Sequence, residues 1–328
     1  MNTFTINTIE GKSFPSINGK TILDSAFSSE FVFEYNCKSG QCGACKTTLL
    51  EGEVIEIQEQ LALNKKDAAN QFLTCCCAAA SDIVIDATDL SAMHGVEVKI
   101  LPIRINSLRL LSEDIMQATL RLPPTSNFVF LEGQFVDILG PNSIRRSYSI
   151  ASISSNKEII LLIKRVKNGE FSNYWFVNAK SNDLLRIEGP KGTFFLRDRT
   201  KPLVFLATGT GIAPIVSILD GLDSDPDFNQ IENISLFWGN RVQQDFIWSP
   251  NFKKINVDFY PIVSKDDDDW NGEIGHVQDV ALRVLNNIKK VNVYACGASV
   301  MIDCAKSNFI KSGLNEKDFY SDKFVQSY

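Results

Sequence analysis

The stretch EYNCKSGQCGACKTTLLEGE, from Glu34 to Glu53, carries three cysteines in one short loop: Cys37, Cys42 and Cys45. Glycines and an alanine lie between them, and such small residues let a backbone wind closely around a bound group. A strand-like run follows at once. The loop therefore predicts a group that needs several thiolates, and it requires one more ligand from elsewhere in the chain.

Cys75 supplies the best-spaced fourth thiol, with 29 residues between it and Cys45. The pattern C-x4-C-x2-C followed by a distant cysteine is that of plant-type 2Fe-2S proteins. Cys76 and Cys77 follow directly, so the choice of ligand stays open. The spacing favours Cys75, with the other two as small packing residues. Structural zinc is the competing metal, although zinc sites usually contain two CxxC-like pairs.

Composition places the chain among soluble globular proteins. It has 328 residues, enough for two or three domains, of which 44% are hydrophobic. Its start lacks the basic and apolar regions of a signal peptide, and its most apolar run, LVFLATGTGIAPIVSIL, is short and broken for a bilayer span. We expect a cytoplasmic protein with no membrane partner. In that compartment eight cysteines indicate metal or redox chemistry rather than disulfides.

The net charge of −6 disfavours nucleic acid as a partner. Residues 1–93 hold 12 acidic and 6 basic side chains, whereas the remainder holds 27 of each. The cysteine-rich end therefore carries the whole imbalance. It forms either a solvated acidic surface or a docking surface for a basic electron-acceptor protein.

Three segments differ in their periodicity. Residues 1–93 alternate short strands with helices near 21–29 and 64–72, which indicates a small α+β domain. After a linker near 88–97, residues 97–198 contain evenly spaced β-rich runs typical of an antiparallel barrel. Residues 200–328 alternate apolar strands with helices, as a parallel α/β sheet does.

The run RRSYSI holds Arg146, Tyr148 and Ser149. The first two share one face of a strand, so a cation can meet a phosphate while the tyrosine lies along a planar ring. Ser149 points to the other face, and Arg145 is read as a surface charge. Downstream, Gly169 and Ser172 precede a probable helix, where Ser172 suits an N-cap and the helix start suits a phosphate.

The run LVFLATGTGIAP places Gly209, Thr210 and Gly211 after a strand, with Pro214 in the first helical turn. Such glycines permit close approach of a pyrophosphate, and proline is welcome at a helix start. Ligands of these sheets gather at the carboxyl ends of strands. Four further candidates follow later strands: Arg241, Asp245, Cys296 and Gly297. Cys296 has a second reading as a small core residue.

Cys304 lies in a helical stretch and is expected in the core. The two histidines, His94 and His276, fit no ligand or triad pattern. We read both as surface or structural residues.

With these motifs in hand, the chain resembles the iron–sulfur flavoprotein reductases of the ferredoxin–NADP reductase superfamily. YNCKSGQCGACK resembles the loop of chloroplast-type ferredoxins. The resemblance implies a 2Fe-2S β-grasp domain, a flavin-binding barrel and a nicotinamide-binding domain, in this order. The G-x-x-S segment implies FAD rather than FMN.

The resemblance also assigns roles to residues. It implies Arg146 on the flavin pyrophosphate, Tyr148 against the isoalloxazine and Ser149 near its N5. Cys296 would lie beside the nicotinamide. Tyr148, Ser149 and Cys296 therefore count as catalytic. The other cofactor-binding positions are Lys164 and Val166 at the flavin edge, Gly169 and Ser172 at the pyrophosphate, Gly209 to Gly211, Pro214, Arg241, Asp245 and Gly297 around the dinucleotide, and Phe324 near the flavin face.

Four consecutive acidic residues, Asp266 to Asp269, follow a strand end where the adenosine would bind. They would repel a 2′-phosphate, so we expect NADH. Electrons would pass from NADH to FAD, then to the cluster and an external protein.

Two groups of relatives share this domain order. One serves sugar dehydrases in 3,6-dideoxysugar synthesis, and the other serves aromatic-ring, phenol or methane oxygenases. The first resemblance runs nearly end to end, through LRLPPT, KRVKNGEFSN and LLRIEGPKGTFF, and is preferred. A non-catalytic iron–sulfur carrier is the remaining alternative, against which the flavin and nicotinamide motifs argue.

Overall fold

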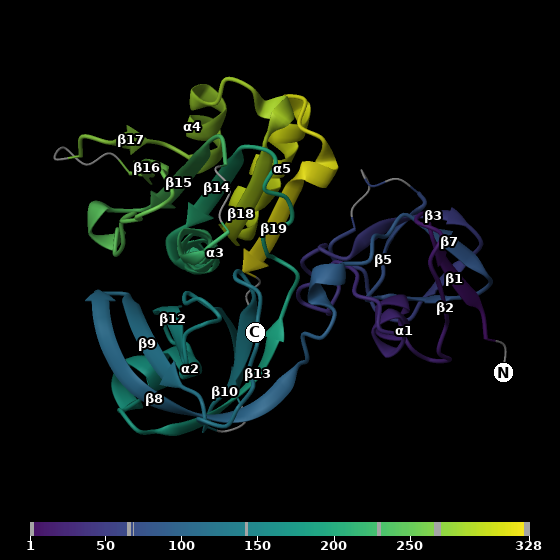
Figure 1. The fold of residues 1–328 in the computed structure, drawn as a ribbon, viewed down its shortest axis with the longest axis horizontal. Coiled ribbons are helices and arrows are strands. Elements are labelled where there is room, and N and C mark those ends of the chain that lie inside the picture. The colour runs from purple at the N-terminus through teal and green to yellow at the C-terminus, as the bar shows by residue number, and fades with distance from the viewer. Residues whose placement is uncertain are drawn as a thin grey trace. The chain divides into compact units, whose positions relative to one another are not determined.

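A computed structural model describes residues 3–63, 67, 69–141, 144–227, 231–265 and 270–324. Its contacts divide the chain into a first unit, Met1–Val96, and a second unit, Glu97–Tyr328 (Figure 1). Each is described by itself. A separate boundary near residue 199, inside the second unit, stays a prediction.

The first unit is the expected α+β fold around a mixed sheet. The helix α1 (Ile22–Ser28) begins where Thr21 Oγ1 accepts a hydrogen bond from Asp24 N. It packs its buried face on a core that includes Phe33 and Leu73. The sheet order is β2 (Ser13–Pro15), β1 (Thr5–Thr8), β7 (Ile83–Ile85), β3 (Lys46–Glu51) and β5 (Gln71–Leu73), with β4 (Val54–Glu56) and β6 (Cys77–Ala79) as a separate pair.

One local prediction in this unit is wrong, and a second is met only in part. The helix expected over 64–72 ends in strand β5, because that segment pairs with β3 through Thr47 and Phe72; residues 64–66 and 68 lie outside the described part. The linker expected near 88–97 contains the boundary between the two units, but its first part is packed against the first unit. Asp89 accepts hydrogen bonds from Lys12 Nζ at 2.9 Å and Val32 N at 3.0 Å, and Met93 is buried. The first unit therefore extends to Val96.

The second unit opens with the predicted antiparallel barrel. Its strands are β8 (Lys99–Ser112), β9 (Ile115–Arg121), β10 (Phe135–Leu139), β11 (Arg145–Ser149), β12 (Glu158–Lys164) and β13 (Leu184–Lys191), in the order β11-β10-β13-β8-β9-β12. A bridge between Ile150 and Leu161 closes the ends. Strands alternate buried and exposed residues, so the core lies inside. The short helix α2 (Glu170–Asn173) and a π-turn (Tyr174–Asn178) pack Phe171 and Trp175 into that core.

A six-stranded parallel sheet completes the unit, as predicted. Its order is β17 (Glu273–Ile274), β16 (Asp258–Val263), β15 (Ile234–Asn240), β14 (Leu203–Thr208), β18 (Asn292–Ala298) and β19 (Phe319–Phe324). The central strands are apolar on both faces because helices cover both. α3 (Ile212–Ser224) covers one face, and α4 (Val277–Val284) and α5 (Ser299–Lys311) cover the other (Figure 1).

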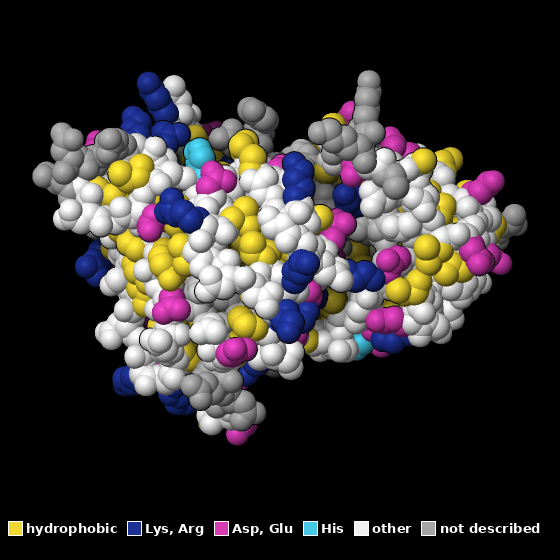
Figure 2. Space-filling view, turned by 90° about the horizontal axis from the view of Figure 1, so that it is seen from above, with side chains coloured by type: hydrophobic (Ala, Val, Ile, Leu, Met, Phe, Trp, Pro, Cys, Tyr) yellow, Lys and Arg dark blue, Asp and Glu magenta, His cyan; other side chains and the backbone are white. Residues whose placement is uncertain are grey.

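Within the described ranges, no helix has the length and apolarity needed to cross a bilayer. On the face of the first unit seen in Figure 2, at the right, acidic and hydrophobic side chains lie next to one another. This mixture matters for the partner considered below.

Candidate functional site

The four predicted thiols of the first unit converge and form two pairs. Cys45 Sγ lies 3.2 Å from Cys75 Sγ, although 29 residues separate them in sequence. Cys37 and Cys42 form the second pair, in which Cys42 N donates to Cys37 Sγ at 3.4 Å. Cys37 is partly exposed and the other three thiols are buried.

Backbone donors surround the loop sulfurs. Ser39 N also points at Cys37 Sγ, at 3.4 Å, and Ala44 N points at Cys42 Sγ, at 3.5 Å. Hydrogen bonds from Cys42 and Ser39 lower the pKa of the Cys37 thiol to about 4. The Cys45 thiol likewise lowers the pKa of Cys75 to about 7. The same hydrogen bonds, together with burial, raise the pKa of the partner thiols Cys42 and Cys45 well above the ordinary value. The geometry therefore favours one thiolate, the form that binds metal, in each pair.

Gly40 makes the loop geometry possible. Its φ of +73° lies in the left-handed region, and a Cβ there would stand 2.2 Å from Glu59 O. Only glycine fits both requirements.

Two pairs of thiolates match the donor set of two irons. The arrangement fits a 2Fe-2S cluster with two thiolates to each iron.

The flavin motif lies on β11, where Arg146 and Tyr148 alternate with outward-facing neighbours. Trp175 Nε1 donates to Tyr148 Oη at 3.1 Å, which fixes the phenol ring against the π-turn. Arg146 Nη1 donates to the carbonyl of Arg145 at 2.7 Å. Arg145 is half exposed, as expected for a surface charge, but it also pairs with Asp137 and Glu188.

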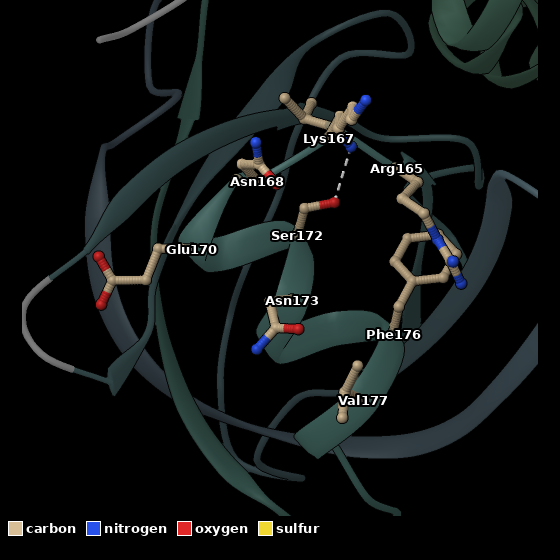
Figure 3. Close-up of a pocket in the computed structure, with 10 residues that line it drawn as sticks. Arg165, Lys167, Asn168, Glu170, Ser172, Asn173, Phe176 and Val177 are labelled. Carbon is tan, nitrogen blue, oxygen red and sulfur yellow. Dashed lines mark hydrogen bonds between the residues drawn. The ribbon is translucent and has the colours of Figure 1, made fainter.

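A hollow of about 420 Å³ opens beside α2 (Figure 3). Arg165, Val166, Lys167, Gly169 and Ser172 are among its lining residues. Two cations beside a helix start give a donor set that suits a phosphate-bearing ligand. The predicted G-x-x-S segment lines this hollow with Gly169 and Ser172, so the residues present suit a pyrophosphate such as that of FAD.

The predicted N-cap at Ser172 is wrong. Gly169 occupies the cap position of α2, and Ser172 lies inside the helix. Its Oγ accepts a hydrogen bond from Val166 N at 2.8 Å, drawn as the dashed line in Figure 3. The hydroxyl therefore closes the turn between β12 and α2.

At the carboxyl edge of the parallel sheet, three glycines have different surroundings. Gly209 has a φ of +54° and open space where a Cβ would lie. A Cβ on Gly211 would meet the Cys296 carbonyl at 2.4 Å, and one on Gly297 would meet Thr208 Oγ1 at 2.3 Å. Gly211 and Gly297 thus let the β14 turn pack against β18, and Gly209 leaves its backbone open. Pro214 lies in the first turn of α3, as predicted.

Asp322 is a candidate site residue that the sequence analysis missed. Its carboxylate is buried on β19, 3.5 Å from Ser149 Oγ and 3.9 Å from Cys296 Sγ. It links the barrel residue and the sheet residue that were predicted to act together. Cys296 is fully buried, and burial together with Asp322 raises the pKa of its thiol well above the ordinary value. Nothing local in the sequence marks Asp322, because its neighbours Ser321 and Lys323 are also polar.

Lys164 and Asp245 contact each other. Lys164 Nζ lies 3.2 Å from Asp245 Oδ2, and Ser112 Oγ donates to Asp245 Oδ1 at 3.2 Å. The contacts join strands β8 and β12 of the barrel to the turn after β15. Arg241 directly follows β15 and is exposed. Thr210 lies in the glycine turn, Gly209–Gly211, that follows β14.

Three remaining predictions have different outcomes. Phe324 ends β19 and is partly exposed. Cys304 was expected in the core and is instead exposed on α5, because its side chain lies on the solvent face of that helix. The acidic run Asp266 to Asp269 lies outside the described residues.

Both histidines have structural surroundings, as expected. His94 Nε2 lies 3.1 Å from Asp89 Oδ1, and His276 occupies the N-cap position of α4.

Family models match three successive parts of the chain. They describe a 2Fe-2S iron-sulfur cluster binding domain over residues 5–80, an oxidoreductase FAD-binding domain over 102–196 and an oxidoreductase NAD-binding domain over 205–307. The predicted 2Fe-2S, FAD and nicotinamide cofactors are thereby confirmed. A carrier without catalytic domains is excluded.

Individual proteins match from end to end. The CDP-6-deoxy-L-threo-D-glycero-4-hexulose-3-dehydrase reductase of Yersinia pestis is 40% identical, over 97% of each chain. The terephthalate 1,2-dioxygenase reductase component 2 of a Comamonas species is 30% identical, over 95% of this chain and 94% of that one. Among solved structures, the ferredoxin reductase in carbazole 1,9a-dioxygenase has a TM-score of 0.67 and 25% identity, over 99% of both chains.

The three matched domains, the paired cysteines and the end-to-end relatives agree on one conclusion. The chain is an NAD(P)H-dependent oxidoreductase and belongs to the iron–sulfur flavoprotein reductases of the ferredoxin–NADP reductase superfamily.

Proposed function

We propose that this protein passes electrons from NADH through FAD and the 2Fe-2S cluster to a CDP-6-deoxyhexulose 3-dehydrase in 3,6-dideoxysugar synthesis. The carrying observation is the 40% identity to a reductase of that name over 97% of each chain. The lower identity of 30% to a dioxygenase reductase keeps an oxygenase component as the alternative acceptor.

Four thiolates would hold the cluster: Cys37 and Cys42 on one iron, Cys45 and Cys75 on the other. The pairing of their sulfurs and the backbone donors around the loop support this assignment. Cys75 is preferred as fourth ligand because its sulfur lies beside that of Cys45.

FAD, when bound, accepts a hydride from NADH and releases the two electrons singly. Arg146, with the cations around α2, would bind the flavin phosphates, and Tyr148 would flank the ring. Tyr148 is pre-positioned by Trp175, so little ordering of the side chain remains to be done on binding.

Ser149, Cys296 and Asp322 would position the nicotinamide against the flavin. Asp322 accepts from Ser149 and stands beside Cys296, so it orients both side chains. Because the Cys296 thiol stays protonated, it offers a small uncharged surface rather than a nucleophile. The buried trio excludes water from the place where a hydride would pass.

The nicotinamide cofactor is NADH in this proposal. Four carboxylates at Asp266 to Asp269 would repel a 2′-phosphate if the loop borders the adenosine, as the sequence suggests. Comparing kcat/KM for NADH and NADPH tests this directly. Preference for NADPH would contradict it.

The acceptor protein would dock on the acidic first unit, beside the cysteine loop. Three large hydrophobic side chains are exposed there: Ile55 at 55%, Ile57 at 48% and Leu61 at 56%. The segment lies along the loop, since Gln58 Nε2 donates to Lys38 O and Ala62 N donates to Gly40 O. It carries four glutamates and no basic residue between positions 51 and 61. An apolar contact within a negative border suits a partner with a basic rim.

Ile57→Ser with Leu61→Ser tests the docking surface. We expect KM for the dehydrase to rise and NADH-driven reduction of the cluster to stay unchanged. Ile9→Ser is a matched control, since Ile9 is similarly exposed in the same unit. Slower cluster reduction with an unchanged KM would instead assign the surface to transfer within the chain.

An anaerobic coupled assay tests the proposed function. The purified protein and NADH are mixed with the pyridoxamine-dependent dehydrase and its CDP-6-deoxy-4-hexulose substrate, and in parallel with an aromatic-ring oxygenase component. We expect reduced 3,6-dideoxy product in the first mixture. Turnover only in the second would reassign the protein to the oxygenase reductases.

A further inference from the structure

Cys76 directly follows Cys75, one of the proposed cluster ligands. The proposed function gives Cys76 no role. Its backbone is fixed at both ends. Cys76 N donates to Leu73 O at 2.9 Å, and Cys76 O accepts from Ile57 N at 2.9 Å and Gln58 N at 3.1 Å. The residue is fully buried. Its side chain therefore has one narrow position to occupy.

The sulfur of Cys76 points at the ligand pair. It lies 3.5 Å from Cys75 Sγ and 3.5 Å from Glu59 O. On the loop side, a Cβ on Gly40 would come within 2.9 Å of it. The thiol is thus enclosed by the cysteine loop, the Glu59 segment and Cys75, and its proton has two acceptors within reach.

We propose that Cys76 tunes the cluster by donating its S–H to the sulfur of Cys75 when Cys75 is a thiolate ligand. The Glu59 carbonyl competes for the same proton. An anionic acceptor forms the stronger hydrogen bond, so the thiolate takes it. Hydrogen bonds to ligand sulfurs are among the features that set iron–sulfur potentials. This bond stabilises the more negative, reduced state and raises the reduction potential.

The competing assignment makes Cys76 the fourth ligand itself, with Cys75 as its neighbour. The geometry favours the donor role, because Cys45 Sγ lies 3.2 Å from Cys75 Sγ. Cys76 Sγ faces the Glu59 carbonyl oxygen at 3.5 Å, a neighbour that suits a protonated thiol rather than a thiolate ligand. The two assignments predict opposite results for the same variants.

The experiment is an EPR-monitored redox titration of the full-length, cluster-loaded protein and three variants, with Cys75→Ser as a fourth variant for the EPR line shape. In Cys76→Ala the donor is lost, and we expect a potential lower by about 59 mV, which corresponds to about a tenfold smaller ratio of reduced to oxidised cluster at fixed potential. Cys76→Ser keeps a donor and should recover most of the shift. Cys77→Ala is the matched control, because Cys77 is equally buried but begins β6 opposite Glu56. It should titrate like the native protein.

Iron content and the EPR line shape decide between the assignments independently of turnover. A native line shape in Cys76→Ser, with a potential near the native one, supports the proposal. Equal potentials in Cys76→Ala and Cys77→Ala overturn it. Loss of the cluster, or an altered line shape, in Cys76→Ser while Cys75→Ser keeps the native signal would make Cys76 the ligand and also overturn it.

Discussion

The two redox sites proposed for this molecule are built in different ways. The proposed cysteine site comes almost entirely from one loop, Cys37 to Cys45, with a single thiol, Cys75, added from a later turn. The proposed flavin–nicotinamide site joins side chains of β11, β18 and β19, whose residues lie up to 173 positions apart. A local site is lost by changing one of its own ligands. An assembled site also depends on residues that hold separate strands together, so distant substitutions can weaken it.

Cys45→Ser gives the largest expected effect and separates the two sites. Removing one thiolate should lower electron transfer to the protein acceptor by more than about 100-fold, because the cluster is held by its cysteine thiolates. Reduction of FAD by NADH, followed by flavin bleaching, should stay near the native rate. Cys304→Ser is the control, since that thiol is exposed on α5. An equal loss of flavin reduction in a folded variant would contradict the separation.

Asp322→Asn examines the assembled site in the same way. The amide keeps the size of the side chain but weakens its hydrogen bond with Ser149, so we expect flavin reduction to slow by about 10- to 100-fold through misplacement of the reacting groups. The cluster EPR signal should be unchanged. Asp303→Asn is the matched control, because Asp303 is exposed on α5 and pairs with Lys323, the neighbour of Asp322 on β19. Native flavin reduction in Asp322→Asn would remove Asp322 from the site.

The contrast also explains what could be read from the sequence. The cysteine ligands follow from spacing, and the barrel and parallel sheet follow from periodicity, since these are local signals. Asp322 carries no local signal, because only the pairing of β18 with β19 brings it to Cys296. Ser172 was misread for a related reason. A serine near a helix start resembles an N-cap, but the hydroxyl of Ser172 instead accepts a hydrogen bond from Val166 N.

Arg146→Gln tests whether β11 binds the flavin phosphate. Loss of a charge-assisted hydrogen bond should raise the Kd for FAD by about 10- to 100-fold. Fluorescence titration of the apoprotein with FAD measures this. Arg104→Gln is the control, because Arg104 is exposed on β8 and, like Arg146, donates to a backbone carbonyl. Equal affinities in the two variants would place the phosphate elsewhere.

Asp245→Asn gives the smallest expected effect, because it loosens the contact between barrel and parallel sheet without touching a proposed catalytic group. Lys164 is more than a third exposed, and solvent screens such pairs. The free energy of unfolding should therefore fall by no more than about 1 kcal/mol. A double-mutant cycle with Lys164→Met separates the ion pair from the hydrogen bond with Ser112, since only the pair contributes to the coupling energy. A coupling energy near zero would assign the loss of stability to the hydrogen bond from Ser112, and the contact between barrel and parallel sheet would then depend on that hydrogen bond rather than on the ion pair.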